Sequence, residues 1–357
     1  MSPLDSIFTP EQIARARRYH RPAYLALGAD LVLGTAALAL LAVFARWRIG
    51  PWWLGCAVLA AAVVAISTGL RLPLAFWRGY LHERRWGFST QSPGGWAADR
   101  LKGFLIAVAL TVLPVEALVA LVRALPSWWP AVAAPGAALL VLLLGFVAPV
   151  LLEPVFNRFR PLEDAALAEE LRALAVRAGV PVRDVLVADA SRRTRKVNAY
   201  VSGIGSTRRV VVFDTLLERA QPRELKVVIA HELGHRRERH IAFGTALGMA
   251  GAALGVLVVW ALVRHPGDPA NVPLVMLVVA LLQLAWLPLE TAISRRWERS
   301  ADRFSLELTR DAEAFEAAHR ELALANLSDL DPPRWLYRIL FTHPTAPERI
   351  AAARSTL

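Results

Sequence analysis

Cysteine and lysine are scarce in this sequence, and each scarcity is informative. The only cysteine, Cys56, lies in an apolar stretch, so the chain can form no intramolecular disulfide and offers no cysteine-based metal site. The N-terminus stays polar and basic up to Arg21, so the pattern of a cleaved signal peptide is missing. Nearly all cations are arginines, which is typical of GC-rich bacterial genomes. Lysine occurs only at Lys102, Lys196 and Lys226.

The net charge of +11 does not indicate binding of nucleic acid, because no zinc-finger or aromatic RNA-binding motif accompanies it. The cations instead flank long stretches that carry one charge or none. Apolar residues make up 55% of the chain and the mean hydropathy is +0.40, which is too apolar for an ordinary soluble protein of this length. The composition therefore indicates a membrane protein with the lipid bilayer as a partner.

Six apolar stretches are candidates for membrane-spanning helices. Each has about 18–23 residues, which is enough for a helix to cross a hydrocarbon core of roughly 30 Å. Proline and glycine mark the short turns between neighbouring stretches. The predicted spans are Tyr24–Ala45, Trp52–Leu70, Gly103–Val122, Ala131–Leu152, Ile241–Val263 and Val272–Leu289.

The loops between the predicted spans alternate in charge. Arginines precede the first span, and further cations fill the second loop and the long segment Asn157–His240. The remaining loops are short, hold few cations and gather tryptophans, as expected at a membrane interface. The positive-inside rule then places both termini and the polar segments in the cytoplasm, and we expect a multi-pass protein of the bacterial inner membrane.

Some charged residues have two interpretations. Asp30 and Glu116 fall within predicted spans, where a charge is costly unless it faces a partner or a wet cavity. They could line an internal polar space. The cation run Arg192–Lys196 could be attracted to anionic lipid or could bind the terminal carboxylate of a substrate.

The polar segment after the fourth span has the pattern of a mixed α/β unit. Glu163–Ala178 has the period of an amphipathic helix, and Val182–Ala188 alternates like a strand. Asn198–Ser202 and Arg209–Phe213 flank a glycine-containing turn, which predicts a hairpin. Pro222 is predicted to open the next helix, which runs almost directly into the fifth span.

That helix carries the motif His231-Glu232-Leu233-Gly234-His235. Two histidines four residues apart lie on one face of a helix, so both rings can reach one Zn²⁺, and Glu232 can accept a proton from a water that the metal activates. A zinc hydrolase also needs a third protein ligand. His240 has the wrong spacing for the extended motif that ends in a third histidine.

The third ligand is predicted after the sixth span, where Glu298 and Asp302 share one helix face. Glu298 can bind the metal, while Asp302 can orient a ligating histidine through its other ring nitrogen. Spans five and six form a hairpin that returns the chain to the same side, so the two helices can pack together. Without the upstream motif, the same two residues would indicate only a solvated pair.

Several further blocks resemble the CAAX prenyl protease 1 family, which consists of integral-membrane zinc endopeptidases of the gluzincin type. Glu298–Asp302 is similar to the family's E-x-x-A-D block. The family has seven spans around a water-filled chamber, whereas six spans are predicted here. The other similar blocks are Asn198-Ala199-Tyr200 with Val210–Leu217, Thr342-His343-Pro344 with Glu348-Arg349, Glu83–Gln91 and Glu153–Leu162.

The resemblance implies a catalytic centre. His231, His235 and Glu298 would hold one Zn²⁺ per chain, and Glu232 would be the general base. His343 would donate a hydrogen bond to the oxyanion that develops during peptide hydrolysis.

The resemblance also implies supporting and substrate-binding residues. Asp302 and Arg349 would organise the ligands from outside the metal shell. Asn198, Ala199 and Tyr200 would pair with the backbone of an extended peptide substrate.

We therefore predict a multi-span α-helical membrane protein with a cytoplasmic, mainly helical α+β zinc metallopeptidase domain. Residues 1–156 would form an N-terminal membrane domain with four spans, and residues 241–292 a transmembrane hairpin. Residues 157–240 and 293–357 would form the two catalytic segments.

The predicted function is that of a zinc metalloendopeptidase of the EC 3.4.24 class. Its substrate would be a peptide or protein, and the family trims the C-terminal residues of prenylated proteins. Two alternatives stay open. One is a heat-shock-type metalloprotease for the quality control of membrane proteins, although such relatives usually have fewer spans. The other is a transporter or lipid-binding protein with a vestigial site, supported only by Asp30 and Glu116.

Overall fold

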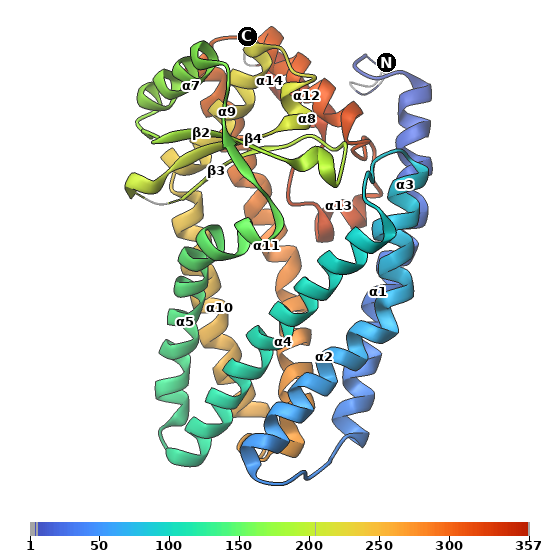
Figure 1. Cartoon of the computed structure of the whole chain (residues 1–357), viewed down its shortest axis with the longest axis vertical. Helices are drawn as coiled ribbons and strands as arrows, with labels where there is room; N and C mark the ends of the chain where they lie inside the picture. The colour runs from blue at the N-terminus through green and yellow to red at the C-terminus, as the bar shows by residue number, and fades with distance from the viewer. Residues whose placement is uncertain (1–3, 5, 204, 356–357) are drawn as a thin grey trace.

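A computed structural model describes residue 4, residues 6–203 and residues 205–355 of the chain. Long helices form a bundle, and shorter helices and strands form a cap on one end of it (Figure 1). Both ends of the chain lie at the cap (Figure 1). The contrast between apolar and polar segments in the sequence thus corresponds to two layers along the longest axis.

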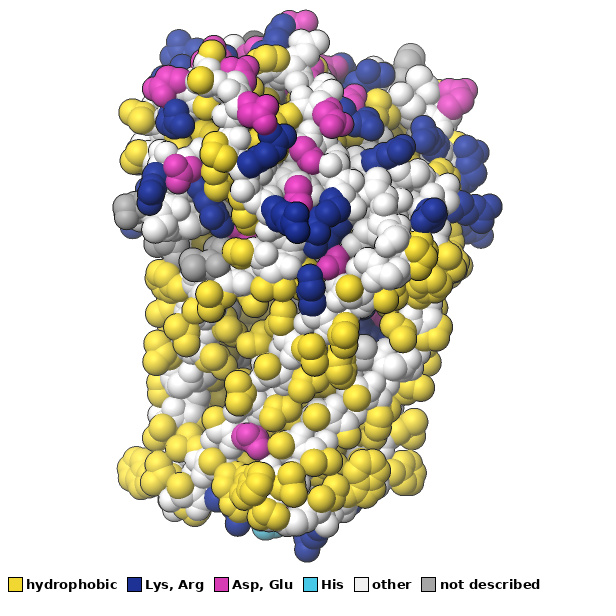
Figure 2. Space-filling model, in the orientation of Figure 1, with side chains coloured by type: hydrophobic (Ala, Val, Ile, Leu, Met, Phe, Trp, Pro, Cys, Tyr) yellow, Lys and Arg dark blue, Asp and Glu magenta, His cyan; other side chains and the backbone are white. Residues whose placement is uncertain are grey.

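Within the described residues, six helices are long and apolar enough to cross a membrane, and each predicted span falls on one of them. Apolar side chains cover the bundle, while charged side chains gather on the cap (Figure 2). The bundle therefore presents a surface suited to lipid. Its helices are α1 (Pro10–Phe44), α2 (Trp52–Phe76), α4 (Pro93–Ala124), α5 (Trp129–Val147), α10 (His240–Leu262) and α11 (Val272–Thr309).

Two bundle helices continue through π-helical turns into short helical ends. α2 passes through η1 (Trp77–His82) into α3 (Glu83–Arg85), and α5 passes through η2 (Ala148–Leu152) into α6 (Glu153–Phe156). Two of the blocks that resemble the family begin at the first residues of α3 and α6. The acidic side chains of these two residues both contact the cap.

The cap contains a four-stranded sheet in the order β1-β2-β4-β3. The predicted hairpin is present as β3 and β4, which are antiparallel with Ala199 opposite Val212. The predicted strand before it is β2, which pairs in parallel with β4, and the short strand β1 was not predicted. β3 is therefore an edge strand. The strands are β1 (Phe159–Pro161), β2 (Asp184–Ala188), β3 (Ala199–Ser202) and β4 (Arg209–Phe213).

The core of the cap lies where helices α7, α9 and α12 pack with the sheet. Pro222 opens α9 as predicted, and Gln221 and Glu224 complete a capping box there. Leu171 and Ile229 are fully buried in this core. The cap helices are α7 (Ala165–Arg177), α8 (Asp214–Leu217), α9 (Pro222–Arg237), α12 (Ala312–Ala325), α13 (Arg334–Leu340) and α14 (Ala346–Arg354).

Helices α9 and α10 are separated by a short break at Glu238 and Arg239. Arg239 lies between them in the left-handed region, with φ 59° and ψ 25°, and redirects the chain within one residue. Helix α11 runs without a break for 38 residues from the bundle into the cap. The two helices with the predicted ligands are thus directly connected to the bundle.

Asp30 has a partner within the bundle. It accepts hydrogen bonds of 2.8 and 2.6 Å from Arg71, which joins α1 to α2. Glu116 is half-buried on α4. The ion pair offsets the free-energy cost of placing a charge within a span, so no water-filled cavity is needed to explain Asp30. Asp30 therefore does not support a transport path.

The cation run at residues 192–196 fastens the loop after α3 to the cap. The Arg195 amide donates a hydrogen bond of 2.9 Å to the Phe88 carbonyl. Lys196 pairs with Glu83 at 2.7 Å, and its ammonium lies 4.8 Å from the centre of the Phe88 ring. Arg195 and Lys196 thus take part in contacts within the chain.

Candidate metal centre

Two helices bring the three predicted ligands together. His231 and His235 lie one turn apart on α9, and Glu298 lies on α11. The two Nε2 atoms are 3.1 Å apart, and the carboxylate oxygens of Glu298 lie 3.3 Å from His231 Nε2 and 3.2 Å from His235 Nε2. One ligand atom from each residue lies within 4.8 Å of the other two.

Gly234 allows α9 and α11 to approach each other closely. A Cβ atom at this position would lie 3.2 Å from Ala301 Cα and 3.1 Å from Phe304 Cδ1. A larger side chain would therefore push the helices apart. The glycine within the motif thus helps to carry Glu298 to the two histidines.

The donor set fits a divalent metal ion, since two imidazoles and a carboxylate are typical ligands of such ions. Among the described residues, Glu298 Oε2 is buried and accepts no well-formed hydrogen bond, although His343 Nδ1 lies 2.8 Å and His231 Nε2 3.3 Å away. A buried carboxylate oxygen without a hydrogen bond is costly. A cation among the three donor atoms would satisfy it.

Asp302 and Arg349 lie behind His231. His231 Nδ1 is 2.9 Å from Asp302 Oδ1. Arg349 donates a hydrogen bond of 2.8 Å from Nε to Asp302 Oδ2, and its Nη2 donates to Oδ1. Because the carboxylate can only accept, His231 Nδ1 carries the hydrogen, and this orientation directs Nε2 toward the other ligands.

The electrostatic field of the centre favours positive charge. Burial and the nearby Arg349 oppose a charged imidazole, but the neighbouring carboxylates of Asp302 and Glu298 outweigh them and raise the pKa of His231 to about 9. A bound cation would replace this proton. Burial raises the pKa of Glu232, because its carboxylate loses hydration there.

His319 on α12 joins this network and was not predicted. Its Nε2 lies 3.8 Å from Asp302 Oδ1, and its Nδ1 lies 2.8 Å from the Phe315 carbonyl, to which it donates a hydrogen bond. Burial lowers the pKa of His319 to about 3, so the ring is neutral. Only its place on the buried face of an amphipathic helix could have indicated this position.

His343 reaches the centre from the loop between α13 and α14. Its Nδ1 lies 2.8 Å from Glu298 Oε2, and 60% of its side chain is exposed. Arg295 holds the preceding helix in place, because its Nη1 donates a hydrogen bond of 3.1 Å to the Tyr337 carbonyl. His343 therefore stands at the open side of the centre, where a substrate can reach it.

The edge strand β3 packs beside the motif helix α9. Because Asn198 accepts a hydrogen bond of 3.0 Å from the Phe213 amide, the backbone groups of Ala199 point away from β4. The Asn198 side chain accepts from the Ala199 amide at 2.9 Å, and Arg236 donates to the Val201 carbonyl at 2.6 Å. The outward edge next to the centre is thus partly covered by the protein's own side chains.

The side chain of Tyr200 is directed elsewhere. Its hydroxyl lies 3.4 Å from Glu153 Oε2, and Ser202 donates a hydrogen bond of 3.0 Å to Glu153 Oε1. Arg209 pairs with the same carboxylate at 3.2 Å. Tyr200 and Ser202 therefore tie β3 to the end of α6.

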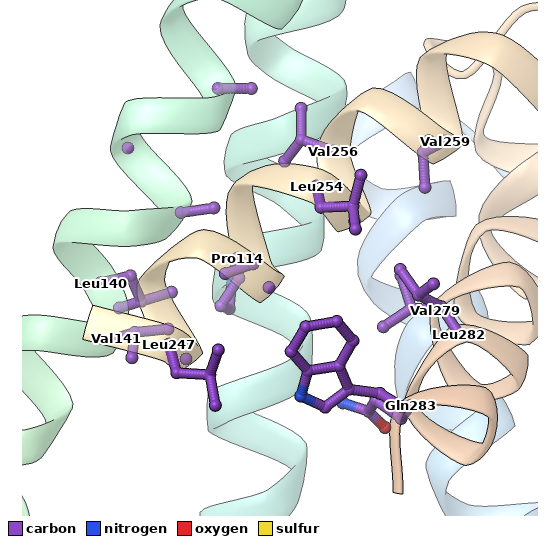
Figure 3. Close-up of a pocket in the computed structure, with 18 of the residues that line it drawn as sticks. Pro114, Leu140, Val141, Leu247, Leu254, Val256, Val259, Val279, Leu282 and Gln283 are labelled. Carbon is purple, nitrogen blue, oxygen red and sulfur yellow. The ribbon is translucent and has the colours of Figure 1, made fainter. Parts of the chain in front are cut away.

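A cavity of about 950 Å³ lies between α4, α5, α10 and α11. Leu140, Leu247 and Leu282 face it from three of these helices (Figure 3). The lining is mostly apolar and extends to Trp297 and Thr342, the chain neighbours of Glu298 and His343. An apolar chamber within the bundle therefore adjoins the metal centre.

The ligand set lies on helices that are directly connected to membrane-spanning ones, and this arrangement defines a membrane-embedded metallopeptidase. Residues 161–357 match the family model for Peptidase family M48, and residues 4–158 match the model for the CAAX prenyl protease N-terminal region with five membrane helices. The chain belongs to peptidase family M48.

Named relatives agree with this family. The chain is 31% identical over 301 residues to the uncharacterized metalloprotease YhfN of Bacillus subtilis, covering 81% of this chain and 70% of the relative. It is 24% identical over 352 residues to the CAAX prenyl protease 1 homolog of Homo sapiens, covering 84% and 73%. The crystal structure of S. mikatae Ste24p has the same fold, with a TM-score of 0.80, 22% identity, and coverage of 97% of this chain and 89% of that chain.

These matches confirm the resemblance to CAAX prenyl protease 1, the multi-pass membrane fold and the metalloprotease class. One difference concerns the N-terminal region. The family model describes five membrane helices there, whereas α1, α2, α4 and α5 are the four long apolar helices that this chain forms within residues 6–158. Within described residues 6–158 the chain thus forms one long apolar helix fewer than the family description gives.

Proposed function

We propose that the protein is a zinc endopeptidase in which His231, His235 and Glu298 hold one Zn²⁺. The observation that carries this proposal is the convergence of three ligand atoms within 4.8 Å around a buried carboxylate oxygen that lacks a hydrogen bond. Zinc accepts imidazole and carboxylate ligands and leaves one position open at catalytic sites.

The residues around the ligands then have distinct roles. A bound Zn²⁺ would supply a Lewis acid that polarises the peptide carbonyl and acidifies water. Glu232 takes the proton of the attacking water and passes it to the leaving amine. His343 donates a hydrogen bond to the developing oxyanion. Asp302 and Arg349 keep His231 in its ligating orientation.

The edge strand provides a place for an extended peptide. A substrate strand could add beside α9 at the outward carbonyl of Ala199, and it would displace the Asn198 side chain from the Ala199 amide. The Asn198 and Tyr200 positions would flank this strand. The neighbouring apolar cavity supports a substrate with an apolar anchor, either a prenyl chain or a membrane segment. This makes a lipid-tethered peptide the favoured substrate class.

The orientation in the membrane is part of the same proposal. Cations gather on the cap and on its boundary with the bundle (Figure 2). The positive-inside rule then places the cap, both termini and the metal centre in the cytoplasm, with the bundle in the bacterial inner membrane. Residues 1–156 and 241–292 would be the membrane parts, and residues 157–240 and 293–357 the catalytic parts.

The test is hydrolysis of one quenched fluorescent peptide in farnesylated and unmodified forms by detergent-purified protein with stoichiometric zinc. Cleavage that requires zinc and is lost in Glu232→Gln would support the proposed centre. Cleavage of the farnesylated form alone would support a lipid-tethered substrate, and equal cleavage of both would indicate a general membrane peptidase. Activity that persists after complete removal of metal would contradict the zinc mechanism.

A further inference from the structure

The ring of His235 has a polar partner on the side away from the centre. His235 Nδ1 lies 3.1 Å from His240 Nδ1, and His240 Nε2 lies 3.2 Å from Glu238 Oε2. Ser300 of α11 donates a hydrogen bond to the same oxygen of Glu238. We propose that His240 is a positioning residue for His235, supported by Glu238 and Ser300. This inference rests on the proposed role of His235 as a metal ligand.

The hydrogens in this chain can be assigned from the donor capacity of each group. The carboxylate of Glu238 only accepts, so His240 Nε2 carries a hydrogen and donates it. In a neutral ring, His240 Nδ1 then offers a lone pair. His235 Nδ1 must therefore carry the hydrogen between the two rings. This leaves the lone pair of His235 Nε2 directed at His231 Nε2 and Glu298, where a metal would lie.

The alternative assignment is incompatible with metal binding. If His240 Nδ1 carried a hydrogen, His235 Nδ1 would have to accept it. His235 Nε2 would then be protonated in its neutral form and could not bind a metal. The contact with His240 thus selects the one tautomer of His235 that can act as a ligand.

The break between α9 and α10 makes this contact possible. In a continuous helix a residue five positions on would be rotated by about 140°, away from the ring of His235. The left-handed Arg239, with φ 59°, interrupts the helix and turns His240 back toward it. Trp297 of α11 then stacks on the His240 ring, with centroids 5.3 Å apart and planes at 14°. His240 is only 6% exposed, so its ring is fixed by packing.

The two histidine ligands are therefore supported in different ways. Asp302 contacts His231 directly, and Arg349 balances its charge. His235 contacts a neutral ring, and the carboxylate lies one step further out. Both arrangements leave Nε2 free for a metal, but only one of them places a negative charge directly against a ligand.

The test compares metal binding by three variants in detergent. His240→Phe keeps an aromatic ring against Trp297 but removes both nitrogens, whereas His240→Asn restores an acceptor near the position of Nδ1. Arg296→Gln, an exposed residue of α11, is the matched control. The affinity for Zn²⁺ is measured by competition with a chromophoric chelator, and the ligand field by the visible absorption of Co²⁺-loaded protein.

We expect His240→Phe to weaken zinc binding by roughly 10- to 100-fold and to shift the Co²⁺ spectrum, with His240→Asn recovering most of both. Unchanged affinity and spectrum in His240→Phe would overturn the inference. If His240→Phe does not fold, Glu238→Leu decides, because leucine cannot accept the hydrogen of His240 Nε2. Weaker zinc binding in this variant would support the positioning role of His240, and unchanged binding would refute it. A His235→Ala variant with normal zinc affinity would instead refute the proposed centre itself.

Discussion

The metal centre in the cap and the apolar cavity in the bundle share α11 but use it in opposite ways. In the centre, Glu298 and Asp302 face groups from α9, α12 and α14 at distances of 2.8–3.8 Å. In the cavity, residues such as Leu282 and Trp297 contribute surface to a space of about 950 Å³. Directional polar contacts determine the geometry of the metal centre, whereas the shape and apolar area of the lining determine the properties of the cavity.

This difference predicts how each region responds to substitution. A directional polar network loses its function when one member is lost, because each group fixes the orientation of the next. An apolar wall is insensitive to small changes and responds mainly to filled volume. Replacements should therefore have large effects at the centre and graded, substrate-dependent effects in the cavity.

The largest effect is expected for Glu232→Gln. Loss of the proton acceptor should lower kcat by about 10²- to 10⁴-fold, which is the usual contribution of general acid–base catalysis. Bound zinc, measured by elemental analysis, should stay at one per chain because Glu232 is not a ligand. Retained activity would remove Glu232 from the mechanism, and a parallel loss of metal would indicate that it acts as a ligand.

The next effect concerns the buried ion pair behind His231. Arg349→Met should destabilise the cap by about 3–5 kcal/mol, because it leaves the carboxylate of Asp302 buried without its cationic partner. Arg354→Met is the matched control on the same helix, where the exposed pair with Glu316 should matter little. Thermal unfolding in detergent measures both variants. Equal shifts in Tm for the two variants would mean that the buried ion pair stabilises the cap no more than the exposed one does.

The cavity should respond more mildly. Gly251 lines it, and a Cβ atom added there would meet nothing within 4 Å, so we expect Gly251→Phe to extend into the cavity and fill part of it. We expect KM for a farnesylated peptide to rise several-fold while an unmodified peptide is unaffected. Gly145→Phe is the control, since Gly145 is similarly unobstructed but outside the cavity lining. Equal changes in KM for the farnesylated and the unmodified peptide would show that the cavity does not bind the lipid part of the substrate.

The smallest effect is expected on the surface of the cap. Hydrogen bonds from Arg223 hold the pKa of Asp311 below its usual range. This pair therefore adds stability above the ordinary pKa of about 3.9, and the contribution is lost as the pH falls through the lower folded-state value. The difference in Tm between the native protein and Arg223→Gln should be present at pH 7 and shrink below about pH 4. A constant difference would show that charge pairing is not its cause.

Much of the architecture was predictable because its signals are local. The six spans follow from length and apolarity, and the hairpin of β3 and β4 follows from two alternating stretches around a turn. The meeting of α9 with Glu298 was also predictable, because a membrane hairpin must return the chain to the same side. The catalytic roles of these residues stay predictions until the variants are measured.

Other features depend on contacts between distant parts of the chain. The parallel pairing of β2 with β4 and the docking of the Phe88 loop on Arg195 have no local signature. The contact of His240 with His235 depends on a left-handed arginine, a conformation that sequence patterns do not indicate for this residue type. His319 was not predicted, since its proximity to Asp302 requires the packed cap.

Helix α11 also fixes the distance between the predicted span and Glu298. It rises about 1.5 Å per residue, so Glu298 stands about 14 Å along the axis from Leu289, where the predicted span ends. Because the helix has no break between these residues, the proposed metal ligand Glu298 is held at a constant distance from the bundle. The peptide bond cleaved in a membrane-tethered substrate would then be selected by its distance from the membrane anchor. The amino-acid sequence around that bond would matter less than this distance.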